Sequence, residues 1–162
     1  MLPFRKVLVT TDFSETSLDA VPLAAEMAAH FGATLCLVHV LPVDAPTPWD
    51  VPPYADFGLA SLPVPEYEGQ VRREVERRLG QVVSKHVPDS VTVEPLVVRG
   101  DAATEVHRIA KELGVDLIVI ATHGWTGWRH LVFGSVAERV LREAPCAVLS
   151  IRRPGAPPAA AG

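Results

Sequence analysis

The chain has 162 residues, of which 48% are hydrophobic and 21% charged, and its formal net charge is −4. This length suits one domain with a single sizeable core, which we expect over residues 1–152, followed by a flexible Pro/Ala/Gly-rich tail over 153–162. The negative charge argues against a generic nucleic-acid surface, and apolar runs of about five residues are too short to span a membrane.

The cysteines and the first residues predict a cytoplasmic protein. Cys36 and Cys146 lie in apolar, strand-like segments, and the chain has neither a CxxC pair nor a His/Cys cluster. We therefore expect two buried free thiols, which fit a reducing compartment, and no structural zinc. Residues 1–6 lack the apolar core and the cleavage site of a signal peptide.

Strand and helix patterns alternate along the chain. The pattern predicts strands over 6–10, 34–41, 91–98, 116–121 and 146–151, with helices over 15–31, 66–85, 102–113 and 135–143. This alternation predicts an α/β fold: a single doubly wound domain whose five-stranded, mostly parallel sheet has helices on both faces. Ligands of such sheets bind at the carboxyl ends of the strands, where the winding direction reverses. The pattern alone does not fix which strands are neighbours.

Individual residues predict where the helices begin, bend and end. Ser14 is a predicted N-cap, and Gly32 ends the first helix. Pro22 should bend that helix because it lacks a backbone N–H. Residues 135–138 fit a capping box with Ser135 as the N-cap.

Two segments outside the strands have unusual compositions. Residues 42–65 contain seven prolines, so we expect a long connection with little regular structure, of a kind that is usually functional or mobile. The helix that follows carries four arginines on one side, Arg72, Arg73, Arg77 and Arg78. They could form an anion-binding patch, but the interleaved Glu74 and Glu76 favour a solvated helix face.

A glycine-containing loop follows the fourth predicted strand. Ala121-Thr122-His123-Gly124 is followed, after nine residues, by Gly134-Ser135 at the start of the last predicted helix. Glycines allow backbone N–H groups to approach an anion, and a helix start adds unpaired donors, so the loop is a candidate phosphate site. The alternative is that these glycines only make turns. Neither GxGxxG after the first strand nor GxxxxGK[ST] occurs, which argues against a classical dehydrogenase and a P-loop hydrolase.

These motifs resemble the universal stress protein family. The resemblance rests on His123-Gly124, on Gly134 to Leu141, and on Ala144-Pro145-Cys146. Val7 to Ser17, Val38-His39-Val40 and the Gly100-Asp101 turn also match, so the resemblance covers about residues 3 to 152. It implies the strand order 3-2-1-4-5 and a homodimer that pairs through the last strand, Ala147 to Ile151.

The resemblance also implies a set of nucleotide-contacting residues. The family's nucleotide-binding branch carries Gly-x-x-Gly, nine residues, then Gly-Ser or Gly-Thr, and its first glycine falls on Ala121 here. Trp125 stands where the family often has an arginine. The implied contacts to ATP or AMP come from ten residues: Thr11, Asp12, Val40, Ala121, Thr122, His123, Gly124, Gly134, Ser135 and Val136.

The resemblance assigns different parts of the nucleotide to these residues. Asp12 would contact the adenosine, with capping of the first helix as its other role, and the Val40 backbone would contact adenine. Thr122 and Gly124 would line the ribose and phosphate side. Ser135 and Val136 would donate to phosphate, although Ser135 could serve only as an N-cap. His123 invites a general-base role, but no Ser/His/Asp or Cys/His arrangement accompanies it, which favours a loop-stabilising role.

Three functions remain open from the sequence. The first is a homodimeric, ATP- or AMP-binding stress protein that acts as a sensor or regulator through an unknown protein partner. The second is a nucleotide-free dimer that acts through protein interactions, which Ala121 and Trp125 favour. The third is a slow ATP hydrolase, ranked last because no catalytic base and no protein metal ligand is apparent. Mg²⁺ could still accompany ATP, held by phosphates and water.

Overall fold

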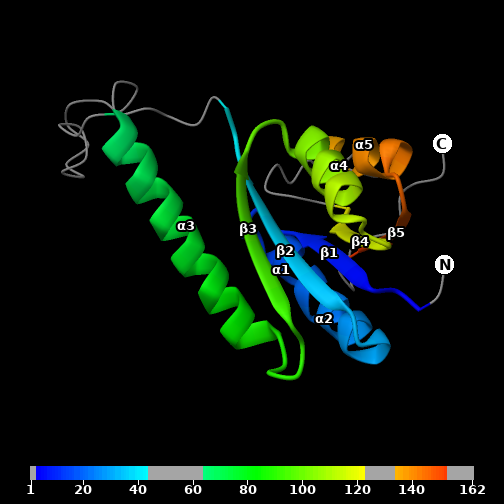
Figure 1. Cartoon of the computed structure of the whole chain (residues 1–162). Helices are drawn as coiled ribbons and strands as arrows, with labels where there is room; N and C mark the ends of the chain where they lie inside the picture. The colour runs from blue at the N-terminus through cyan, green and yellow to red at the C-terminus, as the bar shows by residue number, and fades with distance from the viewer. Residues whose placement is uncertain (1–2, 44–63, 123–133, 153–162) are drawn as a thin grey trace.

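Five parallel strands form the sheet of this protein, shown in Figure 1. The structure is a computed structural model that describes residues 3–43, 64–122 and 134–152. Its strands are β1 (Lys6–Thr10), β2 (Thr34–Leu41), β3 (Val93–Arg99), β4 (Leu117–Ala121) and β5 (Ala147–Ile151). Their order is β3-β2-β1-β4-β5, and every neighbouring pair is parallel. The predicted fold class and strand order are therefore confirmed.

Helices cover both faces of the sheet, as Figure 1 shows. The described helices are α1 (Glu15–Leu18), α2 (Ala20–Phe31), α3 (Val64–His86), α4 (Ala102–Leu113) and α5 (Ser135–Glu143). Val7 and Val9 of β1 point into one apolar cluster, with α2 and α3, whereas Leu8 points into the other, with α4 and α5. Because both faces are covered, the central strands are apolar at nearly every position.

The first predicted helix is two helices. Ser14 caps α1 as predicted, because its side chain accepts the Ser17 N–H. The chain leaves the regular helix at Asp19, and α2 begins at Ala20, which puts Pro22 in the first turn of α2. A first turn tolerates proline because its N–H groups have no partner within the helix. The prediction of one continuous helix was therefore wrong. The interruption follows Leu18, the residue whose carbonyl Pro22 cannot bond, so a disruption caused by Pro22 agrees with the structure. The helix α2 ends at Gly32 as predicted, with φ 63°.

Three of the four arginines on one side of α3 form ion pairs along the helix. Arg72 pairs with Glu76 at 2.9 Å, and Arg77 and Arg78 both pair with Glu74, at 2.8 and 3.0 Å. These pairs support the solvated helix face rather than an anion patch. The opposite side of α3 buries Val75, Leu79 and Val82 in the core.

Several predicted boundaries shift. The helix α3 starts at Val64, so its first two residues belong to a helix and not to the proline-rich connection. The remainder of that connection, residues 44–63, lies outside the described residues, as do His123, Gly124, Trp125 and the tail over 153–162. The strand β3 begins at Val93, two residues later than predicted.

The two thiols are free but differ in burial. Cys36 in β2 is fully buried, and burial and the nearby Glu94 raise the pKa of its thiol to about 11. Cys146 is half-buried and precedes β5, so the prediction of a second fully buried cysteine within a strand was wrong. None of the helices in the described ranges combines the length and apolar character needed to cross a membrane.

Candidate functional site

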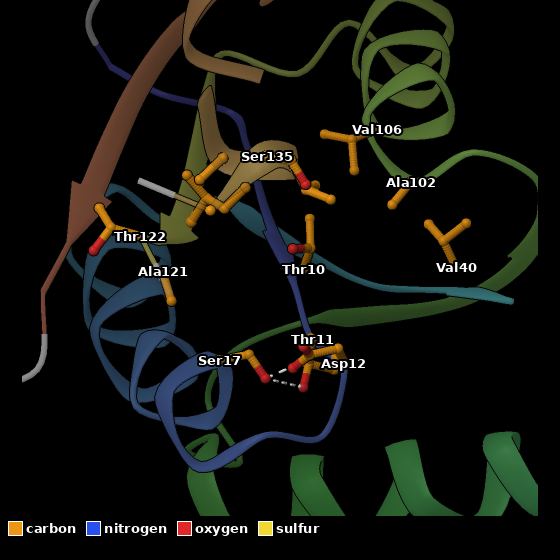
Figure 2. A pocket seen from close by; sticks show the side chains of 14 residues that line it. Thr10, Thr11, Asp12, Ser17, Val40, Ala102, Val106, Ala121, Thr122 and Ser135 are labelled. Carbon is orange, nitrogen blue, oxygen red and sulfur yellow. Dashed lines mark hydrogen bonds between the residues drawn. The ribbon is translucent and has the colours of Figure 1, made fainter. Parts of the chain in front are cut away.

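A pocket of about 230 Å³ opens at the carboxyl ends of β1, β2 and β4. The topology explains its position, because β1 lies between β2 and β4 and the chain leaves these strands toward opposite faces of the sheet. Figure 2 shows the side chains around it: Thr11, Asp12 and Ser17 on one side, Val40, Ala102 and Val106 on another, and Ser135 between α5 and the strands. Asp12 is the one charged side chain among the described residues that line the pocket.

The first wall is the turn between β1 and α1, which is held by its own hydroxyl groups. The hydroxyls of Thr11 and Ser17 share a hydrogen bond of 3.0 Å, and the Asp12 N–H donates to the Ser17 hydroxyl at 3.3 Å. The Asp12 carboxylate accepts the Ser14 N–H at 3.0 Å and also the Ser14 hydroxyl. Asp12 therefore supports the start of α1 while it lines the pocket.

The second wall is the start of α5. Gly134 is the N-cap residue, and Ser135 is the first helical residue, so the predicted capping box with Ser135 as N-cap was wrong. Among the described residues, no side chain caps this helix start. The first hydrogen bond of the helix runs from the Glu138 N–H to the Gly134 carbonyl at 3.0 Å. The N–H groups of residues 135–137 thus precede the helical ladder, at the positively polarised end of α5.

Two backbone hydrogen bonds connect this helix start to the sheet. The Gly134 N–H donates to the Thr122 carbonyl at 2.7 Å, and the Thr122 N–H donates to the Ile151 carbonyl at 3.0 Å. Thr122 is 5% exposed, so these bonds lie in the interior. They bring together the two ends of the glycine-containing segment, whose residues 123–133 lie outside the described part of the chain.

The third wall is apolar and comes from three elements. Val40 lies near the end of β2, Ile120 lies in β4, and Ala102 and Val106 occupy the first turns of α4. Asp101 holds the start of α4 because its carboxylate accepts the Thr104 N–H at 3.0 Å. An apolar surface beside a carboxylate and a helix start can receive a flat apolar ring attached to a polar, anionic group.

Eight of the ten predicted contact residues line this pocket together. They are Thr11, Asp12, Val40, Ala121, Thr122, Gly134, Ser135 and Val136. The other two, His123 and Gly124, lie outside the described residues. The juxtaposition of the eight is a finding, whereas their contact with a ligand remains a prediction.

The sequence reasoning missed the contribution of α4. Ala102 and Val106 line the pocket, but small and apolar residues at helical spacing indicate only a buried helix face. The available signal was the Gly100-Asp101 turn, which starts α4 directly after β3. Since this turn lies at the carboxyl end of a strand, it could have predicted that α4 begins beside the site.

The chain is similar in sequence to known proteins over nearly its whole length. Residues 3–152 match the model of the universal stress protein family. Universal stress protein MJ0531 of Methanocaldococcus jannaschii is 30% identical over 152 residues, which cover 93% of this chain and 84% of that protein. Universal stress protein YxiE of Bacillus subtilis is 30% identical over 152 residues, which cover 92% and 99%.

Solved structures show the same fold. The hypothetical protein MJ0577 superposes with a TM-score of 0.70 at 24% identity, covering 93% of this chain and 96% of its own. A universal stress protein in complex with cAMP gives 0.61 at 21% identity, covering 92% and 97%. A universal stress protein from Archaeoglobus fulgidus in complex with dAMP gives 0.57 at 20% identity, covering 93% and 99%.

Proposed function

Because this chain belongs to the universal stress protein family, we propose that it binds an adenine nucleotide, ATP or AMP, in the pocket between β1, β4 and α5. One observation carries the proposal. A carboxylate, an apolar wall and a helix start that no side chain of the described residues caps surround one cavity, although they come from distant parts of the sequence.

Each wall suits one part of a nucleotide. The apolar surface of Val40, Ala102 and Val106 matches the faces of a purine ring. The Asp12 carboxylate can accept hydrogen bonds from ribose hydroxyls. The backbone N–H groups of residues 135–137 and the Ser135 hydroxyl can donate to a phosphate. Two proteins with the same fold have been solved in complex with cAMP and with dAMP, which supports the proposal of an adenine nucleotide as ligand.

We further propose that the protein is a cytoplasmic homodimer that acts as a sensor or regulator in stress. The edge strand β5 is suited to pairing with a second copy, because its outer edge has no partner strand among the described residues and four of its five residues are half-buried. Two free thiols fit the cytoplasm. Nucleotide binding would then change the shape or the partners of the dimer, and any hydrolysis of ATP would be slow.

One observation favours a second candidate function, a nucleotide-free dimer that acts through protein contacts. Ala121 lines the pocket at the position of the first glycine in the family's nucleotide-binding motif. Its methyl group occupies space that glycine leaves open. The second candidate requires this methyl group to exclude the nucleotide.

Mass spectrometry of the small molecules released from purified, denatured protein distinguishes the two candidates. Co-purified ATP or AMP supports the first. If none is released, calorimetry with added ATP and AMP decides, and an Ala121→Gly variant is the matched control. Binding by Ala121→Gly but not by the natural chain would establish the nucleotide-free function. Absence of binding by both would reject the site.

A further inference from the structure

The turn between β1 and α1 contains the one residue other than glycine that has a positive φ in the described chain. Phe13 has φ 62°, in the left-handed region, which disfavours residues with a Cβ atom. A bulky residue keeps this conformation only where its surroundings enforce it. Phe13 directly follows Asp12, the carboxylate of the pocket. The contacts that enforce the conformation of Phe13 therefore also determine where Asp12 lies.

His39, near the end of β2, supplies two of these contacts. Its ring Nδ1 lies 2.8 Å from the Thr11 carbonyl oxygen. Its ring also lies against the ring of Phe13, with centroids 4.6 Å apart and planes tilted by 31°. His39 lies on β2, the strand next to β1, and thus contacts the residues immediately before and after Asp12 in the turn that follows β1. His39 itself does not line the pocket.

The hydrogen bond determines which nitrogen of His39 carries the proton. A carbonyl oxygen only accepts, so Nδ1 must donate to Thr11. Burial lowers the pKa of His39, which favours the neutral ring with its proton on Nδ1. Among the described residues, the charged groups that act on this ring are Asp12, from the turn, and Arg78, from α3. The guanidinium carbon of Arg78 lies 5.8 Å from the centroid of the Phe13 ring, on a helix packed against the same face of the sheet.

We propose that His39 is a positioning residue for nucleotide binding: its Nδ1–H and its ring hold residues 11–13 in the strained turn that presents the Asp12 carboxylate to the pocket. The inference rests on the proposed function and goes beyond it, because it assigns a role to a side chain outside the pocket. Ser17 holds the same turn from α1 through Thr11 and Asp12. The turn is thus supported from a strand and from a helix.

Three substitutions at position 39 separate the hydrogen bond from the ring contact. His39→Asn places an amide N–H near the position of Nδ1, so it can keep the donor to Thr11 while it loses the ring. His39→Gln has the same polarity, but its amide lies one methylene farther out, near the position of Nε2. His39→Phe keeps a ring and loses the donor. His30→Asn is the control, because His30 is exposed at the end of α2, far from the carboxyl ends of the strands.

Two measurements read out the position of the turn. Calorimetry with ATP and with AMP gives the affinity, and NMR hydrogen exchange gives the protection of the Asp12 and Phe13 amides without ligand. These amides donate to Ser17 and Thr11 hydroxyls within the turn. We expect His39→Gln and His39→Phe to weaken binding about fivefold, as for one lost hydrogen bond, and to speed exchange of both amides. His39→Asn should recover most of both properties, and His30→Asn should change neither.

Specific results would overturn the proposal. It fails if His39→Gln and His39→Phe bind as tightly as the natural chain with unchanged exchange. It also fails if His39→Asn loses as much as His39→Gln, because the donor to Thr11 would then be irrelevant. If His39→Phe does not fold, the Asn and Gln pair decides. If the natural chain binds neither ATP nor AMP, the nucleotide function is rejected, and the exchange comparison still tests whether His39 holds the turn.

Discussion

Gly134 has a backbone conformation that any residue can adopt, with φ −68° and ψ 150°. The conformation of the turn therefore does not require glycine at this position. What glycine supplies at the pocket is the absence of a Cβ atom beside the first N–H groups of α5.

Replacing Gly134 with valine should impair nucleotide binding much more than folding. The branched side chain fits the extended backbone, but it obstructs the approach of a phosphate to the helix start. Calorimetry with ATP and a thermal melt on the same sample measure both effects. An unchanged affinity in a folded Gly134→Val protein would remove this helix start from the site.

Ser135→Ala should weaken nucleotide binding by about 1–2 kcal/mol, the loss expected for one hydrogen bond to a charged group. Because Ser135 is the first helical residue and not the N-cap, the melting temperature should stay nearly constant. Both quantities can be measured on one preparation. A lower melting temperature with the affinity unchanged would show that the hydroxyl stabilises the helix and does not contact the ligand.

His39 should make folding stability depend on pH. Its pKa is lowered in the folded state from an ordinary value of 6.5, chiefly by burial, so the folded protein binds fewer protons there than the unfolded chain. Its contribution to stability is therefore present above about pH 6.5 and is lost as the pH falls through the lower, folded pKa. Urea denaturation from pH 5 to 8, compared with His39→Asn, isolates this contribution from the other histidines. Parallel pH profiles for the two proteins would contradict the expectation.

At the scale of elements, residue patterns predicted those segments whose ends depend on local interactions. The strand β2 has its predicted bounds, and α4 has its predicted Asp101 cap and its Gly114 end, with φ 62° at Gly114. At α5 and at the pocket, what local patterns could not predict depends on contacts between distant residues. The Gly134 N–H donates to the Thr122 carbonyl, and Gly134 is the N-cap of α5. The helix therefore starts one residue earlier than it would with Ser135 as N-cap. Likewise, the pairing of β1 with β4 brings Asp12 and Ser135 to one pocket, and only the family resemblance had indicated that pairing.

Asp101 contacts two helices beside the pocket, and we expect it to stabilise the fold mainly through α4. Its carboxylate caps α4 and accepts a hydrogen bond from Arg139 of α5 at 2.8 Å. Asp101→Ala should cost about 1 kcal/mol of unfolding free energy, as for other N-caps. Asp101→Asn keeps a capping oxygen and loses an exposed ion pair, so it should cost well under half as much. Equal losses in urea denaturation would show that the ion pair matters more than the cap.

At the scale of the whole molecule, β5 contributes to both cores and forms an edge of the sheet. Leu149 and Ile151 pack against the cluster of α2 and α3, whereas Val148 packs against that of α4 and α5. The Ile151 carbonyl also accepts the Thr122 N–H beside the pocket. The stability of the fold and the geometry of the pocket therefore both depend on this strand.

Deleting residues 147–162 should abolish the proposed dimer and lower the melting temperature, because the deletion removes both core contacts and the pairing edge. Deleting residues 153–162 alone should do neither. Light scattering measures the mass, and a thermal melt measures the stability. A dimer that survives the longer deletion would place the interface on another surface.

The hydrogen bond between Gly134 and Thr122 has a consequence for how this protein can vary. It joins the residues that flank the segment 123–133. The end of β4 and the start of α5 are therefore held together independently of the sequence between them. Closing a loop costs little more when it lengthens, about 0.6 kcal/mol for each doubling. Insertions, deletions and whole replacement sequences between Thr122 and Gly134 should therefore be tolerated by the fold. This segment is thus a place where selection or design can change the sequence with little risk to the scaffold.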